Sequence, residues 1–318
     1  MSRAFFESKR FQIQTTHIDF QRDEAVKKKP IFLASAVVAL VGSFLFWRGQ
    51  NAGTIDATNV GPNTVEQQEE SKTRAVTMGE VLELAQDARD HSATNLNDYT
   101  ATFVKQEVEA NGKLGPESSI EMRVQTRLRN ETDDAPMRVY LHFTAPEAVN
   151  GREIIWGEDL YDGQMAVHEV GMMMGWKTWW LDPNGIVAMQ GQRYPISEIG
   201  LVKLVEKLIE RGEKDRNNPD VTATLTKDHS IDGVEAQLIQ VRRAKPSGDE
   251  DEDFSMAEIS IDPKRKLILQ YRSFGWPAEE GDEELPLQES YTYRDIKTNI
   301  GLKDIDFDVT NPAYKFPK

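Results

Sequence analysis

Two stretches of the sequence alternate between apolar and polar residues, and this alternation constrains the fold more than any other feature. From Ile120 to Leu128 apolar residues, with one threonine, occupy every second position, and Met137 to Thr144 repeats the pattern. Side chains of a β-strand point alternately to its two faces, so each run buries one face and exposes the other. Half-buried strands of this kind are typical of antiparallel sheets.

The rest of the chain after residue 77 adds further strands and two helices. Thr77 and Glu80 have the spacing of a capping box before a helical pattern that should end near residues 92–95. A second apolar stripe with helical period runs from about 197 to 212. Strands and helices do not alternate, so the sequence predicts an α+β fold. We expect one large curved antiparallel sheet of about eleven strands, partly closed on itself, with both amphipathic helices on its concave apolar face. The further strand-like runs are 99–110, 151–158, 163–171, 173–181, 220–228, 233–243, 255–262, 266–275 and 287–297.

A charge-free apolar run, Ile31 to Trp47, follows three consecutive lysines near the N-terminus. At ~1.5 Å per residue its seventeen residues span ~25 Å, slightly less than the ~30 Å hydrocarbon core of a bilayer. Basic residues are concentrated before the run, so the positive-inside rule places residues 1–30 in the cytoplasm. We interpret residues 31–47 as an uncleaved signal anchor that forms one transmembrane helix. The alternatives are a cleaved signal peptide, a misassigned start or a buried globular helix.

Residues 48–76 differ in composition from the rest of the chain after residue 76. They are rich in Asn, Thr, Gln, Gly and Glu and show neither strand nor helix period, so we expect a flexible linker. A random coil of this length has a root-mean-square reach of ~30 Å. Residues 77–318 should therefore form one outer domain that stays close to the membrane.

Composition and motifs argue against several classes of function. The chain has no cysteine, which excludes disulfides, thiol nucleophiles and cysteine-ligated metals. A formal net charge of −15 repels phosphate backbones, so we expect no nucleic-acid partner. The five histidines lack metal-ligand spacing, and no G-x-S-x-G or glycine-rich phosphate motif occurs. We therefore expect no catalytic residue, no metal site, no cofactor and no enzymatic activity.

The segment 172–181 is apolar on both faces of its predicted strand. Such a strand must be covered on both sides, either by protein or by a ligand. Methionine adapts to varied shapes and tryptophan offers a wide rigid surface. Two interpretations stay open: a central strand with a loop packed on its back, or the wall of an apolar ligand site. In the second, Met172, Met174, Trp176 and Trp180 would contact the ligand.

Several short motifs occur together along roughly residues 77–316. They are Tyr99–Glu107, Gly112–Leu114, Gly151–Glu153, Gly191–Ile196, Glu289–Tyr293, Asn299–Leu302, Asp306–Asp308 and Asn311–Pro312. In these motifs the chain resembles an uncharacterised family of bacterial envelope proteins (a domain of unknown function) related to the lipoprotein-localisation, LolA/LolB-like superfamily. Members of that superfamily are unclosed β-barrels with helices over a hydrophobic cavity that holds acyl chains. The resemblance implies the same fold here, in the periplasm or cell envelope.

The resemblance also implies a function and a set of site residues. A membrane-anchored outer domain would bind a hydrophobic ligand such as a lipid or lipoprotein acyl chain. The alternative is a protein-interaction or regulatory module of the envelope, with a protein partner and no ligand transport. Burying an acyl chain gains ~0.8 kcal/mol per CH₂ without specific hydrogen bonds, so its site shows in sequence only as surplus inward apolar area, which a filled barrel also needs. The residues expected to line the cavity are Phe103, Met122, Val139, Leu141, Phe143 and Trp176.

Overall fold

The computed structural model describes residues 72–317 except 110, 128–134, 172–174, 249–252 and 278–283. The predicted cytoplasmic segment, the predicted transmembrane helix and the linker up to residue 71 lie outside the described residues. Within them, no helix combines the length and the apolar character needed to cross a membrane.

The described residues contain twelve strands and two α-helices, with four short 3₁₀ turns. The strands are β1 (Thr73–Val76), β2 (Asp98–Glu107), β3 (Ser118–Gln125), β4 (Arg138–Ala145), β5 (Glu153–Gly157), β6 (Met165–His168), β7 (Trp179–Leu181), β8 (Val221–Ile231), β9 (Val234–Arg243), β10 (Met256–Asp262), β11 (Leu267–Phe274) and β12 (Leu287–Thr298). The helices are α1 (Met78–Asn95) and α2 (Leu201–Asp215), and the turns are η2 (Glu147–Val149), η3 (Tyr161–Gly163), η4 (Ile196–Glu198) and η5 (Asp304–Phe307).

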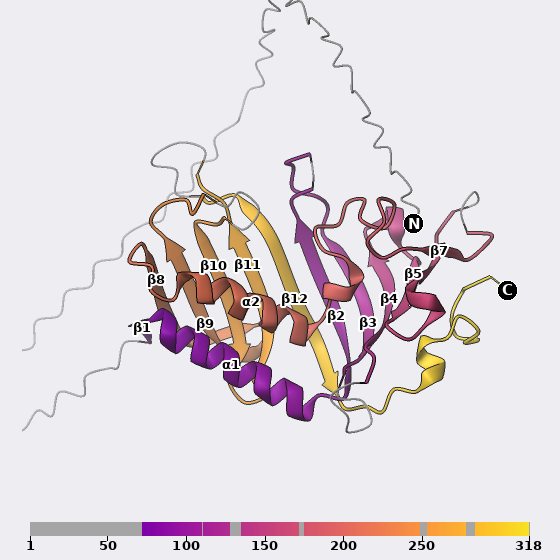
Figure 1. Cartoon of the computed structure of the whole chain (residues 1–318), viewed down its shortest axis with the longest axis horizontal. Helices are drawn as coiled ribbons and strands as arrows, with labels where there is room; N and C mark the ends of the chain where they lie inside the picture. Colours follow the sequence, from indigo (N-terminus) through magenta and orange to yellow (C-terminus); the bar gives the residue numbers. More distant parts are fainter. Residues whose placement is uncertain are drawn as a thin grey trace, which may run out of the picture. The chain divides into compact units, whose positions relative to one another are not determined.

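All twelve strands form one open sheet in the order β1-β8-β9-β10-β11-β12-β2-β3-β4-β5-β6-β7 (Figure 1). Every neighbouring pair is antiparallel, which confirms the predicted sheet. The structure has one strand more than the eleven predicted runs, because β1 forms from the last residues of the predicted linker and pairs with β8. β1 and β7 are the two edges of the sheet.

The predicted strand 173–181 is much shorter in the structure. Only β7 remains of it, because the chain turns before Trp179. Gly171 adopts a φ of +92°, and the Gly175 N–H donates to the Gly171 carbonyl at 2.9 Å. A residue without a Cβ reaches this left-handed region without strain, so a turn starts where the sequence predicted the beginning of a strand.

Both predicted helices are present, and local chemistry sets their starts. The Thr77 hydroxyl accepts the Glu80 N–H at 3.1 Å, and Glu80 Oε2 accepts the Thr77 N–H at 2.9 Å, which confirms the capping box of α1. α2 starts later than predicted because Gly200, with a φ of +113°, interrupts the helical backbone. The Leu201 N–H donates to the Tyr99 hydroxyl at 3.0 Å, which ties this helix end to β2.

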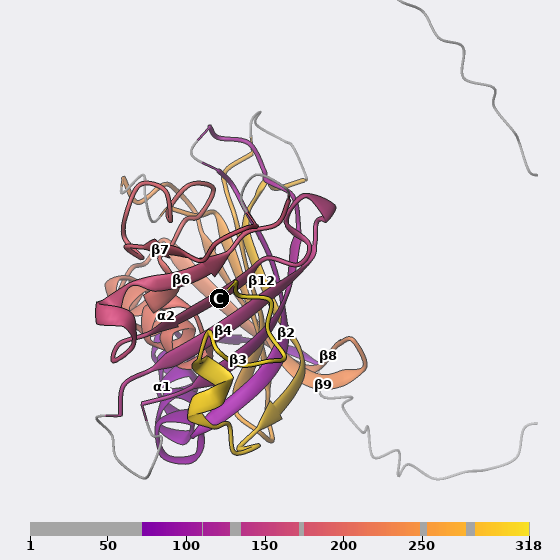
Figure 2. The same cartoon turned by 90° about the vertical axis from the view of Figure 1, so that its right-hand side faces the viewer.

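The two helices lie side by side across one face of the β8–β11 half of the sheet (Figures 1 and 2). Their apolar stripes face the inward side chains of the strands. Leu82 of α1, Val205 of α2 and Ile239 of β9 are almost completely buried in the core. This half of the sheet is therefore closed by helix side chains.

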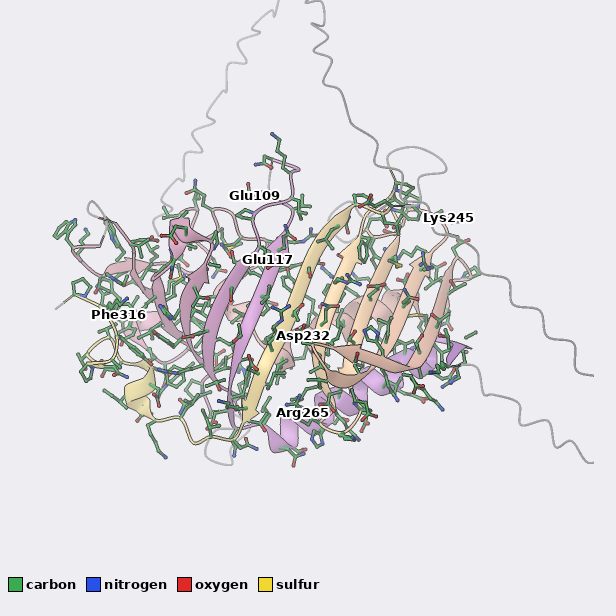
Figure 3. All side chains as sticks on the ribbon, turned by 180° about the vertical axis from the view of Figure 1, so that it is seen from behind. Glu109, Glu117, Asp232, Lys245, Arg265 and Phe316 are labelled. Carbon is green, nitrogen blue, oxygen red and sulfur yellow. The ribbon has the colours of Figure 1, made fainter. Side chains whose placement is uncertain are left out.

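A second, smaller core lies on the opposite face of the sheet. Here Phe307 and Phe316 of the C-terminal segment pack on Tyr140, Ile155 and their neighbours in β4–β6. The Phe316 label in Figure 3 marks this region, at the end of the sheet away from the label of Lys245. The β4–β6 part of the sheet is therefore covered on its outer face, so the inner face of these strands is left to form a site.

The capping box of α1 gives a prediction for stability. Thr77→Ala removes the side-chain acceptor of the Glu80 N–H and should lower the free energy of unfolding by ~1 kcal/mol. Thr94→Ala, in the last turn of the same helix, is the control and should be nearly neutral, because the exposed hydroxyl bonds only within this turn: it donates to the carbonyls of Asp90 and His91 and accepts from the Asn95 side chain. Equal effects of the two substitutions on urea denaturation would contradict the capping role.

Candidate functional site

A pocket with a volume of about 540 Å³ lies over the β2–β7 half of the sheet. Strands β2 to β7 and β12 form its floor, and residues 183–200 with the start of α2 form its cover. The apolar side chains on its wall are Phe103, Ile120, Leu141, Phe143, Ile154, Met165, Val167, Leu181, Pro183, Val187, Ala188, Pro195, Ile196, Ile199 and Leu204.

The space beneath the two helices is different. Only about 60 Å³ remains there, because side chains of α1, α2 and β9–β11 interdigitate. The sequence led us to expect the cavity under both helices, and the structure places the main empty volume beside them. Helices bring large apolar side chains at every turn, whereas the segment that covers the pocket is a loop.

The covering segment has a sequence that resists helix and strand formation. Pro183 and Pro195 lack a backbone N–H, and Gly191 has a φ of +71°. Ile186 is the most exposed large apolar residue described, and its neighbour Val187 reaches the pocket wall. The loop therefore crosses the sheet without filling the space below it.

Three of the predicted site residues, Phe103, Leu141 and Phe143, lie on the pocket wall. Met122 and Val139 are on the same strands but are 1% and 0% exposed within the core, and they do not border the pocket. The alternation thus identified the inward face, while the position along each strand decides which inward residues reach the empty space.

The tryptophans predicted to contact a ligand lie elsewhere. Trp176 is 68% exposed in the loop between β6 and β7, and Trp180 is 43% exposed and packs on Tyr161 at 4.9 Å between ring centroids. Neither borders the pocket, and the residue of β7 that does so is Leu181. Met172 and Met174 lie outside the described residues. Ligand contact by the two tryptophans stays a prediction, but they would not make it in this pocket, because Trp176 lies in the loop and Trp180 occupies the outward face of its strand.

A buried polar network forms one side of the pocket, and the sequence analysis did not predict it. Its centre is Glu289 of β12, which is 1% exposed. Arg211 of α2 donates to its carboxylate at 3.2 Å, as do the hydroxyls of Tyr271 at 3.3 Å and Tyr291 at 3.0 Å. Burial would raise the pKa of Glu289, but the Arg211 and Arg193 guanidinium groups more than offset this and hold it below its ordinary value. Glu289 is therefore a permanent anion at neutral pH.

A second carboxylate, Glu107 of β2, extends the network to the pocket. It accepts the Tyr291 hydroxyl at 2.7 Å, the Lys105 ammonium at 3.0 Å and the Arg193 backbone N–H at 3.2 Å. Lys105 also donates to the Gln192 side-chain oxygen at 2.6 Å. Burial, followed by the two neighbouring carboxylates, raises the pKa of Tyr291, so its hydroxyl stays protonated and donates. These bonds connect β2 and β12 to the covering loop.

The network brings together three motifs that are far apart in the sequence. Glu289 pairs with Glu107 across β12 and β2, and two residues along the strands Tyr291 pairs with Lys105. Both pairs lie on the face of Phe103, whose partner is Tyr293. The sequence contains one signal of this network: Lys105 and Glu107 follow Phe103 at every second position, so all three lie on the same face of β2. Alternation of apolar and polar residues misses this signal, because it assigns charged residues to the outward face.

Two further ion pairs border the pocket. Arg152 and Glu169 are 2.9 Å apart, and Glu198 contacts Lys207 at 3.9 Å. Within the described part of the chain, no three His, Asp or Glu residues are grouped so that they could hold a metal ion. The site therefore combines an apolar wall with carboxylates that are held by cations.

The fold and the pocket define a class of protein, an open antiparallel sheet with two packed helices and an apolar pocket beside them. Residues 96–316 match the family described as Protein of unknown function (DUF1571), and the chain belongs to this family. The match confirms the resemblance to an uncharacterised family. Comparison with curated proteins gives no match.

Several solved structures are similar to this chain at low identity. A DUF1329 family protein from Desulfovibrio piger is 12% identical, with 73% of this chain and 97% of that chain covered and a TM-score of 0.35. A putative outer membrane lipoprotein-sorting protein domain from Vibrio parahaemolyticus is 10% identical, with 73% and 97% covered and a TM-score of 0.32. A LolA superfamily protein from Nitrosomonas europaea is 12% identical, with 74% and 98% covered and a TM-score of 0.28. Similarity this low does not transfer a function.

The network gives a prediction for stability and its pH dependence. Glu289→Gln leaves Arg211 buried without its anion and should lower the free energy of unfolding by about 3 kcal/mol at pH 7. Because folding lowers the pKa of Glu289, its contribution is complete above the ordinary glutamate pKa of about 4.3 and is lost as the pH falls through the folded value. The gap between wild type and variant should therefore shrink below about pH 4, as urea denaturation at several pH values would show.

The control for this measurement is Glu235→Gln, which removes an exposed ion pair with Lys264. Exposed pairs contribute little, so this change should stay below about 0.5 kcal/mol at every pH. A similar loss in both variants would contradict a special role of the buried carboxylate.

Proposed function

We propose that this protein is a membrane-anchored envelope protein whose outer domain binds a hydrophobic ligand, such as a lipid or lipoprotein acyl chain. The observation that supports it is the pocket of about 540 Å³, lined largely by apolar side chains, over one half of the sheet. Its volume lies within the ~300–1,000 Å³ that is usual for ligand sites. Over the other half of the sheet, helix side chains fill the corresponding space. The pocket is therefore confined to one half of the sheet and is not a general packing defect of the domain.

The energetics of an acyl chain suit such a pocket. Burying about twelve methylene groups at ~0.8 kcal/mol each gains ~10 kcal/mol. Association costs at least ~4 kcal/mol in lost translational and rotational freedom. The surplus supports binding without a specific hydrogen bond, as expected for a ligand that varies in chain length.

Binding fits the charged groups of the pocket better than catalysis does. A general base needs a carboxylate or imidazole that is available to accept a proton from the substrate. Glu107 and Glu289 instead accept several hydrogen bonds from cations and hydroxyls, so their oxygens are already occupied. Their arrangement orients the covering loop and leaves the apolar wall to the ligand.

Filling the pocket should abolish ligand binding. Ile154→Trp places a large ring on the pocket wall and should weaken the affinity for a fluorescent fatty-acid analogue at least about tenfold, measured by fluorescence titration. Leu238→Trp is the matched control, because Leu238 is half-buried on β9 and points away from the helix face that contains Ile239. Absence of binding by the wild type would overturn the proposal and favour the protein-interaction module.

The membrane anchor is tested separately. The full chain should sediment with membranes and resist alkaline extraction, because residues 31–47 would bury a charge-free helix in the bilayer. Deleting residues 31–47 should release the protein into the soluble fraction. Recovery of the full chain in that fraction would contradict the anchor but would leave ligand binding by the outer domain intact.

A further inference from the structure

The open pocket and the filled space beneath the helices are neighbours. Tyr291 of β12 borders the pocket of about 540 Å³, and Tyr271 of β11 borders the space of about 60 Å³. The two strands are adjacent in the sheet, and the two tyrosines are partners in their register (Figure 1). Their ring centroids are 6.1 Å apart. The pocket and the filled half of the core are therefore separated by about one strand spacing.

The hydrogen bonds around Glu289 run across this boundary. Tyr291 lies on the pocket side, whereas Arg211 and Tyr271 lie on the helix side, and all three donate to the Glu289 carboxylate. Arg211 also donates at 2.7 Å to the hydroxyl of Tyr194, which borders the pocket. These five residues, Tyr194, Arg211, Tyr271, Glu289 and Tyr291, are called the partition below.

A hydrocarbon chain cannot replace the bonds of the partition. A methylene group has neither a donor nor an acceptor, so a chain that passed between the two spaces would separate Arg211 from Glu289 without compensation. A buried charge that loses its partner is strongly destabilising. The partition should therefore stop a chain that the apolar wall of the pocket accepts.

The pocket is open to solvent at the covering loop. Val187 of this loop borders the pocket and is 68% exposed. Leu181, on the edge strand β7, borders the pocket as well. The partition lies at β12, at the other end of the strands that form the floor. A chain that enters beside Val187 would run across the sheet toward the partition.

We propose that the partition is the inner end of the pocket and sets the maximum length of the ligand's aliphatic chain. This inference rests on the proposed function and adds selectivity for chain length. A chain up to the limit buries all of its methylene groups, and each further group stays at the mouth in water. The ligand is then recognised by the length of its chain, with its headgroup at the mouth.

Straight-chain fatty acids of increasing length test the limit. Each acid is titrated by displacement of a fluorescent fatty-acid analogue from the full chain, kept in solution by an amphipathic polymer instead of detergent. Each added methylene should tighten binding about fourfold up to the limit, and affinity should stay level beyond it. Affinity that rises up to the longest acid would overturn the inference and leave the proposed function standing, whereas no binding of any acid would contradict the proposed function.

Arg211→Met combined with Glu289→Leu opens the partition. Replacing a whole buried ion pair by apolar side chains is often tolerated, and here it also removes Arg211 Nε, a buried donor that has no hydrogen-bond partner among the described residues. The limit should move to longer acids by about two methylene groups, because the space of about 60 Å³ beyond the partition holds about two groups of ~30 Å³, the volume of a water molecule. An unchanged limit in this folded variant would overturn the inference.

Arg272→Met combined with Glu258→Leu is the matched control. This ion pair also joins neighbouring strands, β10 and β11, but it lies on the opposite face, because the adjacent residues Ile259 and Tyr271 border the space beneath the helices. The limit should stay where the wild type has it. A shift as large as in the partition variant would overturn the inference.

Two substitutions on the pocket wall decide the matter if the partition variant does not fold. Ile120→Phe adds volume beside Phe103, its partner on β2, whose ring lies 5.8 Å from that of Tyr291. This change at the inner end should move the limit to shorter acids. Leu181→Phe adds volume at the β7 end and should weaken binding of all acids by a similar factor without moving the limit. The same shift of the limit in both variants would overturn the inference.

Discussion

The buried ion pair between Glu289 and Arg211 connects the parts of this domain that sequence places far apart. It links β12 to α2, while the hydroxyls of Tyr271 and Tyr291 extend it to β11 and toward β2. Since a buried charge is tolerated only with a well-placed partner, the carboxylate restricts where α2 can lie on the sheet. Tyr194 of the covering loop donates to the same carboxylate at 3.2 Å, so the carboxylate also restricts the position of this loop. The pair stands at the boundary between the filled and the hollow halves of the inner face.

The contrast between those halves explains how one sheet supports both stability and binding. Where α1 and α2 cross β8–β11, large side chains interdigitate and leave about 60 Å³. Where the loop crosses β2–β6, its side chains border the space without filling it, and about 540 Å³ stays open. The outer face of β4–β6 is closed by the C-terminal segment, so these strands remain covered on one side even though the other faces the pocket. The cavity is thus compatible with a well-packed domain.

The sequence predicted best those features of a residue that depend on its neighbours along the chain, such as the face of a strand on which it lies. The alternation in β3 and β4 identified the inward face of the sheet. On this face Leu141 and Phe143 of β4 and Phe103 of β2 border the pocket. Prediction from sequence was least successful for side chains whose environment comes from distant segments. Lys105 has an inward position on β2 but a charged end, and its partner Gln192 lies 87 positions away. Trp176 belongs to an apolar run, yet the turn at Gly171 places it in solvent.

The amino-acid sequence by itself determined most of the strands, both helices and the capping box of α1, because periodicity and capping depend on residues that are close together along the chain. It also carried the motifs that identify the family. Tertiary structure alone decided the strand order, in which β12 lies beside β2, and the position of the empty volume. It also decided that Glu107 and Glu289 meet behind one loop. These features depend on contacts between segments that are about 180 or more residues apart. The free energies of packing and of buried charge that select them act only once those segments are in contact.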